Sequence, residues 1–233
     1  MLETVKLTKN FSRHTAVDQL SLSIQPGEIF AVLGPNGAGK TTTINMLLGF
    51  LEPDDGEARV DGKSVAEDPI AARRQLAYIP ELVMLYPRFT GVENLDYFSK
   101  LGGRKHTRAE LLDLLERAGL QSDAARRRVS TYSKGMRQKV GIALALATEA
   151  KGLLLDEPTS GLDPAASHAF SQLIQRLAKE DVAILMATHD LFRAREDATR
   201  VGILVDGKLS GEYGADEVKN ADLEKLYLKH LRA

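Results

Sequence analysis

The stretch Ile29-Phe-Ala-Val-Leu33, followed by Gly34-Pro-Asn-Gly-Ala-Gly-Lys40-Thr41, decides how this chain folds. Its first five residues are all apolar, which is typical of a strand covered on both faces of a parallel sheet. The next eight match the pattern G-x-x-x-x-G-K-[ST], and the residues from Thr41 to about Gly49 favour a helix. A plain glycine-rich turn before a core helix is the alternative, but this order of strand, motif and helix predicts a phosphate-binding turn.

In such a turn, backbone N–H groups surround phosphate oxygens at the positive end of the helix that follows. Lys40 would act in catalysis by neutralising charge on the β- and γ-phosphates, and Thr41 would offer its hydroxyl to Mg²⁺. We therefore expect a nucleotide to be bound by Gly34, Pro35, Asn36, Gly37, Ala38, Gly39, Lys40, Thr41 and Thr42.

The composition is that of an ordinary globular chain, with 233 residues of which 43% are hydrophobic and 27% are charged. The 31 Lys and Arg and 32 Asp and Glu leave a net charge of −1, so we expect no nucleic-acid partner. The absence of cysteine excludes disulfides, thiolate zinc sites and cysteine nucleophiles, and suits a cytoplasmic location. The chain shows no secretory signal and no apolar run long enough to cross a bilayer, so a partner chain would have to supply any membrane span.

Strand and helix patterns alternate through the chain, which predicts an α/β fold with a mostly parallel sheet. Apolar strand runs recur at residues 153–155 and 182–188, and Asp163-Pro164 between them should start a helix. Residues 4–8 alternate as a half-buried strand does, and residues 24–33 predict two strands joined by a turn at Pro26-Gly27. Short antiparallel strands are expected at residues 53–62 and a hairpin at 203–207, and a final helix runs through Leu223, Leu226, Tyr227 and Leu231.

Residues from about 82 to 130 carry helix signals without buried-strand runs, so we expect a helical subdomain inserted in one domain that spans residues 1–233. Thr90-Gly-Val-Glu93 and Thr107-Arg-Ala-Glu110 both match the capping box, in which a hydroxyl and a carboxylate satisfy free backbone N–H groups. The second helix should stop near Gly119, which readily takes the left-handed cap. The run Arg126-Arg-Arg128 favours a solvated face, with contact to a membrane partner as the alternative.

An acidic pair follows the apolar strand run at residues 153–155. Asp156 would hold Mg²⁺, and Glu157 would accept a proton from the attacking water. His189, after the run at 182–188, would donate to the γ-phosphate as a third catalytic group beside Glu157 and Lys40. Taken alone, the acids would suit a solvated strand end and the histidine a structural role, but the phosphate-binding turn favours the catalytic reading.

Taken together, these residues resemble the ATP-binding subunit of ABC transporters over nearly the whole chain. The resemblance rests first on the phosphate-binding turn at residues 34–41 and on the acidic pair Asp156-Glu157. It also rests on further segments in the family's order, namely Tyr132-Ser-Lys-Gly-Met136 (the signature), Ser160-Gly-Leu-Asp163 (the D-loop), Thr188-His-Asp190 (the switch loop) and Phe11 (an adenine-stacking aromatic).

The resemblance implies a P-loop, RecA-like core with an antiparallel β-subdomain and an inserted helical subdomain. It also implies a head-to-tail dimer of identical chains, with each ATP between the P-loop of one chain and the signature of the other. Phe11, Ser133, Gly135 and Asp163 would then join the nucleotide site.

Two departures from the commonest family pattern point to the ABC-2 type exporter branch. Glu81 stands where a glutamine is usual, and its carboxylate would approach Mg²⁺. Lys134 and Met136 replace a glycine and a glutamine of the signature. The final stretch from Asp222 to Leu228 also resembles that branch.

We therefore expect an ATPase subunit that works peripherally on the inner face of the cell membrane and powers transport, most plausibly export, through a separate integral membrane permease. Two alternatives follow from other classes of protein. One is a soluble ABC ATPase acting on a ribosome or on DNA, and the other is a nucleotide-dependent switch with little hydrolysis.

Overall fold

The computed structural model describes residues 1–220 and 223–231 and centres on a six-stranded sheet. The strand order is β10-β9-β3-β8-β7-β6, and every neighbouring pair is parallel except β9 and β10. The strands are β3 (Ile29–Leu33), β6 (Leu76–Ile79), β7 (Gly152–Asp156), β8 (Ala183–Thr188), β9 (Arg200–Val205) and β10 (Lys208–Gly214). The predicted mostly parallel sheet is thus confirmed.

Both faces of this sheet are covered, which explains the uninterrupted apolar run in β3. Because successive side chains of a strand point to opposite faces, Ile29, Ala31 and Leu33 pack into one hydrophobic cluster. Phe30 and Val32 pack into a second cluster on the opposite face. Every residue of β3, β7 and β8 is buried, so these three strands form a rigid platform whose carboxyl ends lie side by side.

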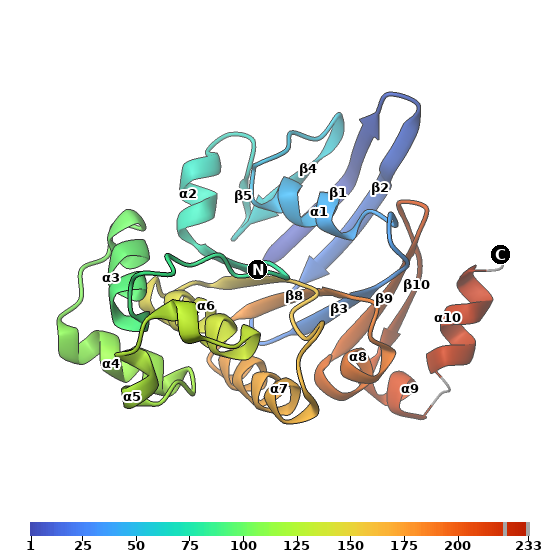
Figure 1. Ribbon diagram of the computed structural model, residues 1–233. Coiled ribbons are helices and arrows are strands. Elements are labelled where there is room, and N and C mark those ends of the chain that lie inside the picture. The colour runs from blue at the N-terminus through green and yellow to red at the C-terminus, as the bar shows by residue number, and fades with distance from the viewer. Residues whose placement is uncertain (221–222, 232–233) are drawn as a thin grey trace.

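A second, antiparallel sheet forms the β-subdomain on one side of the core, as Figure 1 shows. Its order is β2-β1-β4-β5, with β1 (Leu2–Phe11), β2 (His14–Ile24), β4 (Asp55–Val60) and β5 (Lys63–Ser64). Helix α1 (Lys40–Leu47) packs between this sheet and β7 of the core. Only the end of β2 was predicted, although Leu20, Leu22 and Ile24 alternate with serines. The strand is irregular before Leu20, where Gln19 has φ of +50° and the register shifts.

The predicted helical subdomain gathers at one end of the core sheet (Figure 1). Both capping boxes form as predicted, at Thr90 and Thr107, and Gly119 takes a φ of +79° after the second helix. Its elements are α3 (Gly91–Leu101), α4 (Arg108–Arg117), α5 (Ser122–Ala125) and the 3₁₀ turn Val129–Thr131, and α6 (Lys134–Ala147) packs against α3, α4 and β6. The subdomain is therefore joined to the core through the helix that starts at the signature.

The remaining helices complete the core. Helices α7 (Pro164–Lys179), α8 (Leu191–Asp197) and α9 (Ala215–Asn220) lie on the face opposite the β-subdomain, and α10 (Leu223–Leu231) lies beside β9 and α8 (Figure 1). Short α2 (Pro69–Arg74) is capped by the Asp68 carboxylate. Asp222, which opens the stretch expected near the C-terminus, lies outside the described residues. Within residues 1–220 and 223–231, no helix is both long and apolar enough to cross a bilayer.

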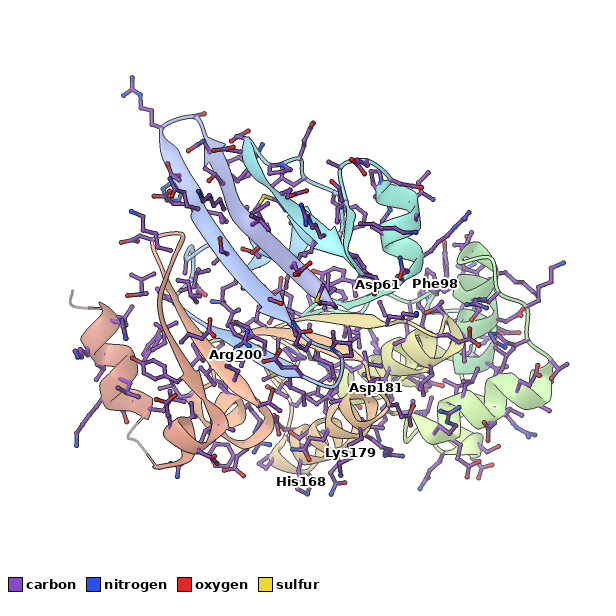
Figure 2. The ribbon with its side chains drawn as sticks, turned by 180° about the vertical axis from the view of Figure 1, so that it is seen from behind. Asp61, Phe98, His168, Lys179, Asp181 and Arg200 are labelled. Carbon is purple, nitrogen blue, oxygen red and sulfur yellow. The ribbon has the colours of Figure 1, made fainter. Side chains whose placement is uncertain are left out.

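Arg200, which is labelled in Figure 2, links the two sheets. It forms ion pairs with Glu28 at 2.9 Å and with Glu212 at 3.0 Å, and it donates a hydrogen bond to the carbonyl of Ser23 in β2. Its guanidinium also lies 4.7 Å from the centre of the Phe30 ring. The antiparallel sheet is thereby held in place relative to the strand that leads into the phosphate-binding turn.

We predict that Leu115→Ala destabilises the chain by about 3 kcal/mol, because Leu115 of α4 is fully buried in the larger cluster and its removal leaves a cavity. Leu101→Ala is the matched control, since this leucine is 68% exposed and its loss should change stability by less than about 0.5 kcal/mol. Urea denaturation measures both. Equal effects would contradict the packing described for the helical subdomain.

Candidate active site

The turn between β3 and α1 is shaped by glycines that no other residue could replace without strain. Gly37 and Gly39 have φ of +85° and +104°, in the left-handed region that favours glycine. A Cβ at Gly39 would lie 2.3 Å from the carbonyl oxygen of Ala16, and a Cβ at Gly34 would lie 2.4 Å from that of Leu204. The backbone therefore fits closely against its neighbours, and the N-terminus of α1 is left facing outward.

This turn borders a cavity of about 270 Å³ at the carboxyl ends of β3 and β7. The cavity is lined by Pro35, Asn36, Gly37, Ala38, Gly39, Lys40, Thr41, Thr42, Glu81, Asp156 and Glu157. The structure thus brings together almost all of the expected turn residues, both acids of the pair after β7, and Glu81 from a loop far away in sequence.

Lys40 is a nearly buried cation, with only 8% of the residue exposed. Its Nζ donates hydrogen bonds to the carbonyl oxygens of Gly34, at 2.5 Å, and Pro35, at 3.2 Å, and lies 3.8 Å from Glu157 Oε1. Burial lowers its pKa, while the nearby carboxylates of Glu157 and Asp156 act in the opposite direction. An anion at the turn would relieve the cost of this burial, as a phosphate group does.

Thr41 and Asp156 meet directly, because the Thr41 hydroxyl donates a hydrogen bond of 2.8 Å to Asp156 Oδ2. Burial raises the pKa of the Asp156 carboxyl, although the hydrogen bond from Thr41 opposes the shift. A hydroxyl and a carboxylate are the hard oxygen ligands that Mg²⁺ prefers, so this pair fits the ion. The described residues contain no cluster of three or more His, Cys, Asp or Glu side chains that could hold a metal ion.

Glu157 is positioned by the end of the neighbouring strand β8. Its backbone has φ of +47°, and its N–H donates to the carbonyl of Ala187 at 2.9 Å. Its Oε2 accepts a hydrogen bond from the Thr188 hydroxyl at 3.3 Å and lies 2.8 Å from His189 Nδ1. A left-handed conformation in a residue other than glycine is sparsely populated, and here two strands hold the carboxylate over the cavity.

Glu81 reaches the edge of the cavity from the loop after β6. Its Oε1 accepts a hydrogen bond of 3.0 Å from the Ser160 hydroxyl and lies 3.7 Å from Lys134 Nζ. Its side chain is 54% exposed, so it is free to change partners.

The four site residues expected from the resemblance alone lie elsewhere in this single chain, and none of these described residues lines the cavity. Phe11 is 47% exposed at the end of β1, with Lys9 Nζ 5.9 Å from its ring. The Ser133 and Asp163 side chains cap α6 and α7, and Gly135 lies in the first turn of α6. The exposure of Phe11 and Ser133 leaves both free to contact a ligand or a second chain.

Three residues near the site carry contacts for which sequence reasoning had assigned no role. Thr188 bonds Glu157, and Ser160 and Lys134 both contact Glu81. Each stood inside a quoted motif, but only the fold shows which distant residue it meets.

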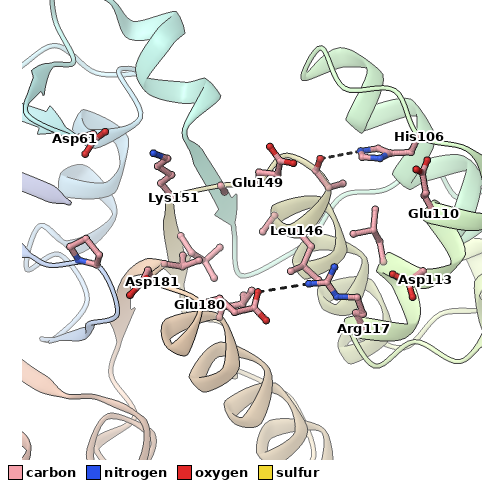
Figure 3. Close-up of a pocket in the computed structure, with 18 of the residues that line it drawn as sticks. Asp61, His106, Glu110, Asp113, Arg117, Leu146, Glu149, Lys151, Glu180 and Asp181 are labelled. Atoms are coloured by element: carbon pink, nitrogen blue, oxygen red, sulfur yellow. Dashed lines mark hydrogen bonds and ion pairs between the residues drawn. The ribbon is translucent and has the colours of Figure 1, made fainter.

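A larger cavity, of about 880 Å³, lies on another part of the molecule, beside α4 and the amino ends of β7 and β8 (Figure 3). His106 contacts the carbonyl of Ala147 there at 3.0 Å, and Arg117 lies 3.8 Å from Glu180. Because it contains neither the phosphate-binding turn nor the acids after β7, the smaller cavity is the better candidate for the reaction.

Known proteins resemble this chain over most of its length. The family model described as ABC transporter matches residues 17–160. The bacitracin transport ATP-binding protein BcrA of Bacillus licheniformis is 36% identical over 227 residues, which cover 97% of this chain and 74% of that protein. The daunorubicin/doxorubicin resistance ATP-binding protein DrrA of Streptomyces peucetius is 36% identical over 222 residues, which cover 94% of this chain and 67% of that protein.

Solved structures extend the similarity to the fold. The structure of an ATP-binding subunit of an ABC transporter superposes with a TM-score of 0.85 and 31% identity, covering 99% of both chains. A dimeric ATP-binding cassette in a post-hydrolysis state, bound to ADP and Pi, gives a TM-score of 0.82 with 27% identity and covers 92% of this chain and 99% of that one. The predicted P-loop α/β fold is therefore confirmed.

We predict that Asp156→Asn stabilises the nucleotide-free chain at neutral pH. A raised native pKa means that the folded chain holds this proton more tightly than the unfolded chain, so stability falls as pH rises from the ordinary pKa through the raised one. Asparagine has no charge to bury and still accepts from Thr41. The increase in the free energy of unfolding of Asp156→Asn over wild type should be complete above the raised pKa of Asp156. It should vanish as the pH falls below the ordinary pKa of aspartate.

Urea denaturation across about pH 3 to pH 8, a range that extends below the ordinary pKa of aspartate, measures this dependence. Asp113→Asn on the exposed side of α4 is the control and should leave stability unchanged. A loss of stability on Asp156→Asn at neutral pH would contradict the burial described for this carboxylate.

Proposed function

This chain belongs to the ABC transporter family, and from that premise we propose that it hydrolyses ATP to drive export through a separate membrane permease. The observation that carries the proposal is the convergence of Lys40, the Thr41–Asp156 pair and Glu157 on one cavity, together with the contact of Glu157 with His189. The relatives named for bacitracin transport and for daunorubicin and doxorubicin resistance support export as the direction.

The geometry suits the hydrolysis of a nucleoside triphosphate. Backbone N–H groups of the turn and the Lys40 ammonium bind the β- and γ-phosphates at the N-terminus of α1. Glu157 accepts a proton from the attacking water, and His189, 2.8 Å from Glu157, holds that carboxylate and donates toward the γ-phosphate. Phosphoryl transfer depends mainly on positioning and charge neutralisation, and this cavity supplies both.

Thr41, Asp156 and Glu81 are the residues that would hold Mg²⁺, and the ion would neutralise charge between the β- and γ-phosphates. The Thr41 hydroxyl and Asp156 carboxylate already lie in contact at the edge of the turn. Glu81 would approach the ion from the loop after β6.

A second copy of this chain would complete the site. The exposed Ser133 at the start of α6 offers a hydroxyl and a helix N-terminus, which suit a phosphate on another subunit. Gly135 and Asp163 would lie at the same interface, and Phe11 would stack on the adenine. The dimeric cassette among the similar structures supports this arrangement.

The permease would lie in the membrane and this chain on its inner face. The fold supplies no span within its described residues, and the relatives are ATP-binding subunits of transporters. The helical subdomain, linked to the cavity through α6 and the Glu81 loop, is the part of the chain that would meet the permease.

Glu157→Gln should keep ATP affinity and lower turnover about 10²- to 10⁴-fold, because the amide preserves shape but no longer accepts the proton. Phosphate release and equilibrium binding of ATP measure the two quantities. Glu149→Gln, at the exposed opposite end of β7, is the matched control and should leave both unchanged. Turnover within threefold of wild type would remove Glu157 from the reaction.

Mixing Lys40→Ala chains with Ser133→Arg chains should restore part of the ATPase activity that each lacks alone. In a head-to-tail dimer, one of the two sites then carries both changes and the other carries neither. The control mixes wild type with a chain that bears both changes, because no such mixed dimer has an intact site formed by the two kinds of chain. Equal activity per mixed dimer in both mixtures, after subtracting the wild-type dimers, would contradict a site shared between two chains.

A further inference from the structure

The two positions at which this chain departs from the common family pattern lie next to each other in the fold. Lys134, in the signature, and Glu81, in the loop after β6, place Nζ and Oε1 3.7 Å apart. The same Oε1 accepts a hydrogen bond of 3.0 Å from Ser160 in the loop that follows Glu157. One carboxylate oxygen therefore joins three segments that border the nucleotide cavity. A glycine and a glutamine at these two positions could not form an ion pair.

Lys134 occupies a position that is electrostatically unfavourable for a cation. It is the first residue of the 14-residue helix α6, where the positive end of the helix dipole repels it, and the first turn of α6 contains no acidic residue. Its side chain is 23% exposed, so water screens the charge only in part. The Glu81 carboxylate supplies the negative charge that the helix itself lacks.

Glu81 also belongs to the acidic lining of the cavity. It lines the same space as Asp156 and Glu157, and its charge adds to the effects that raise the pKa of Asp156. A divalent cation bound beside Asp156 would attract Glu81 for the same reason. Lys134 and the metal would then compete for one carboxylate, which is exposed enough to move between them.

We propose that Lys134 is a positioning residue that holds Glu81 away from the metal in the nucleotide-free chain and releases it when the nucleotide arrives with Mg²⁺. When the nucleotide binds, Mg²⁺ replaces the Lys134 ammonium as the cation in contact with Glu81. The start of α6 is released from the Glu81 loop at the same time. This inference rests on the proposed binding of ATP with Mg²⁺. It also gives a physical reason why Glu81 and Lys134 occur together in this chain.

The test is a Mg²⁺ titration of the binding of a fluorescent ATP analogue, followed at equilibrium. Lys134→Gln should lower the Mg²⁺ concentration for half-maximal binding about two- to fivefold, which is the range expected from an exposed ion pair. Glu81→Gln should raise it, and Lys134→Arg should keep the wild-type value because the cation is kept. Lys139→Gln, further along α6, controls for the loss of one positive charge.

The double variant Lys134→Gln/Glu81→Gln decides whether Lys134 acts through Glu81. We expect it to match Glu81→Gln alone, since no carboxylate is left for Lys134 to hold. A shift of the same size in both backgrounds, or no shift in either, would overturn the inference. Wild-type chain that binds no analogue at any Mg²⁺ concentration would instead overturn the proposed function.

Discussion

The burial of the Lys40 ammonium is the constraint on which the rest of the site depends. A cation with so little exposure needs partners, and the structure supplies the carbonyl oxygens of the turn on one side and the carboxylates after β7 on the other. The ammonium makes no short hydrogen bond to a carboxylate of the described residues, because Glu157 Oε1 lies 3.8 Å away, and its bonds to neutral carbonyl oxygens can be exchanged for bonds to an anion. The cavity therefore retains an attraction for phosphate, and the family to which the chain belongs uses that attraction to bind ATP.

The two-layered packing of the core sheet holds this charge in place. Strands β3, β7 and β8 are adjacent and buried on both faces, so the ends of all three converge at fixed spacing. Lys40 follows the first of these ends, Asp156 and Glu157 the second, and His189 the third. Glu81 follows β6, the next strand along, and its side chain is 54% exposed. The groups that need fixed geometry thus lie at or shortly after the ends of rigid strands, and the group that changes partner lies on a loop.

Local patterns made much of the fold and site predictable from the sequence. The turn at residues 34–41 and the capping boxes at Thr90 and Thr107 are each set by residues a few positions apart, and these form as expected. Strand β2 was mostly missed, although its second half alternates apolar residues with serines; only its first half, where the register shifts, breaks the alternation that identifies a strand. The contact between Glu81 and Lys134 was also out of reach, since it depends on how α6 packs against β6.

The central claim is that the buried ammonium of Lys40 binds nucleotide phosphates in this cavity. Titration calorimetry of ATP with Mg²⁺ into wild-type chain and into Lys40→Met tests it most directly, because methionine keeps much of the side-chain volume and removes the charge. Saturable binding at one site per chain, weakened at least about tenfold by the substitution, is the predicted result, since a charged hydrogen bond is lost. Equal affinity of the two proteins for ATP would contradict the claim.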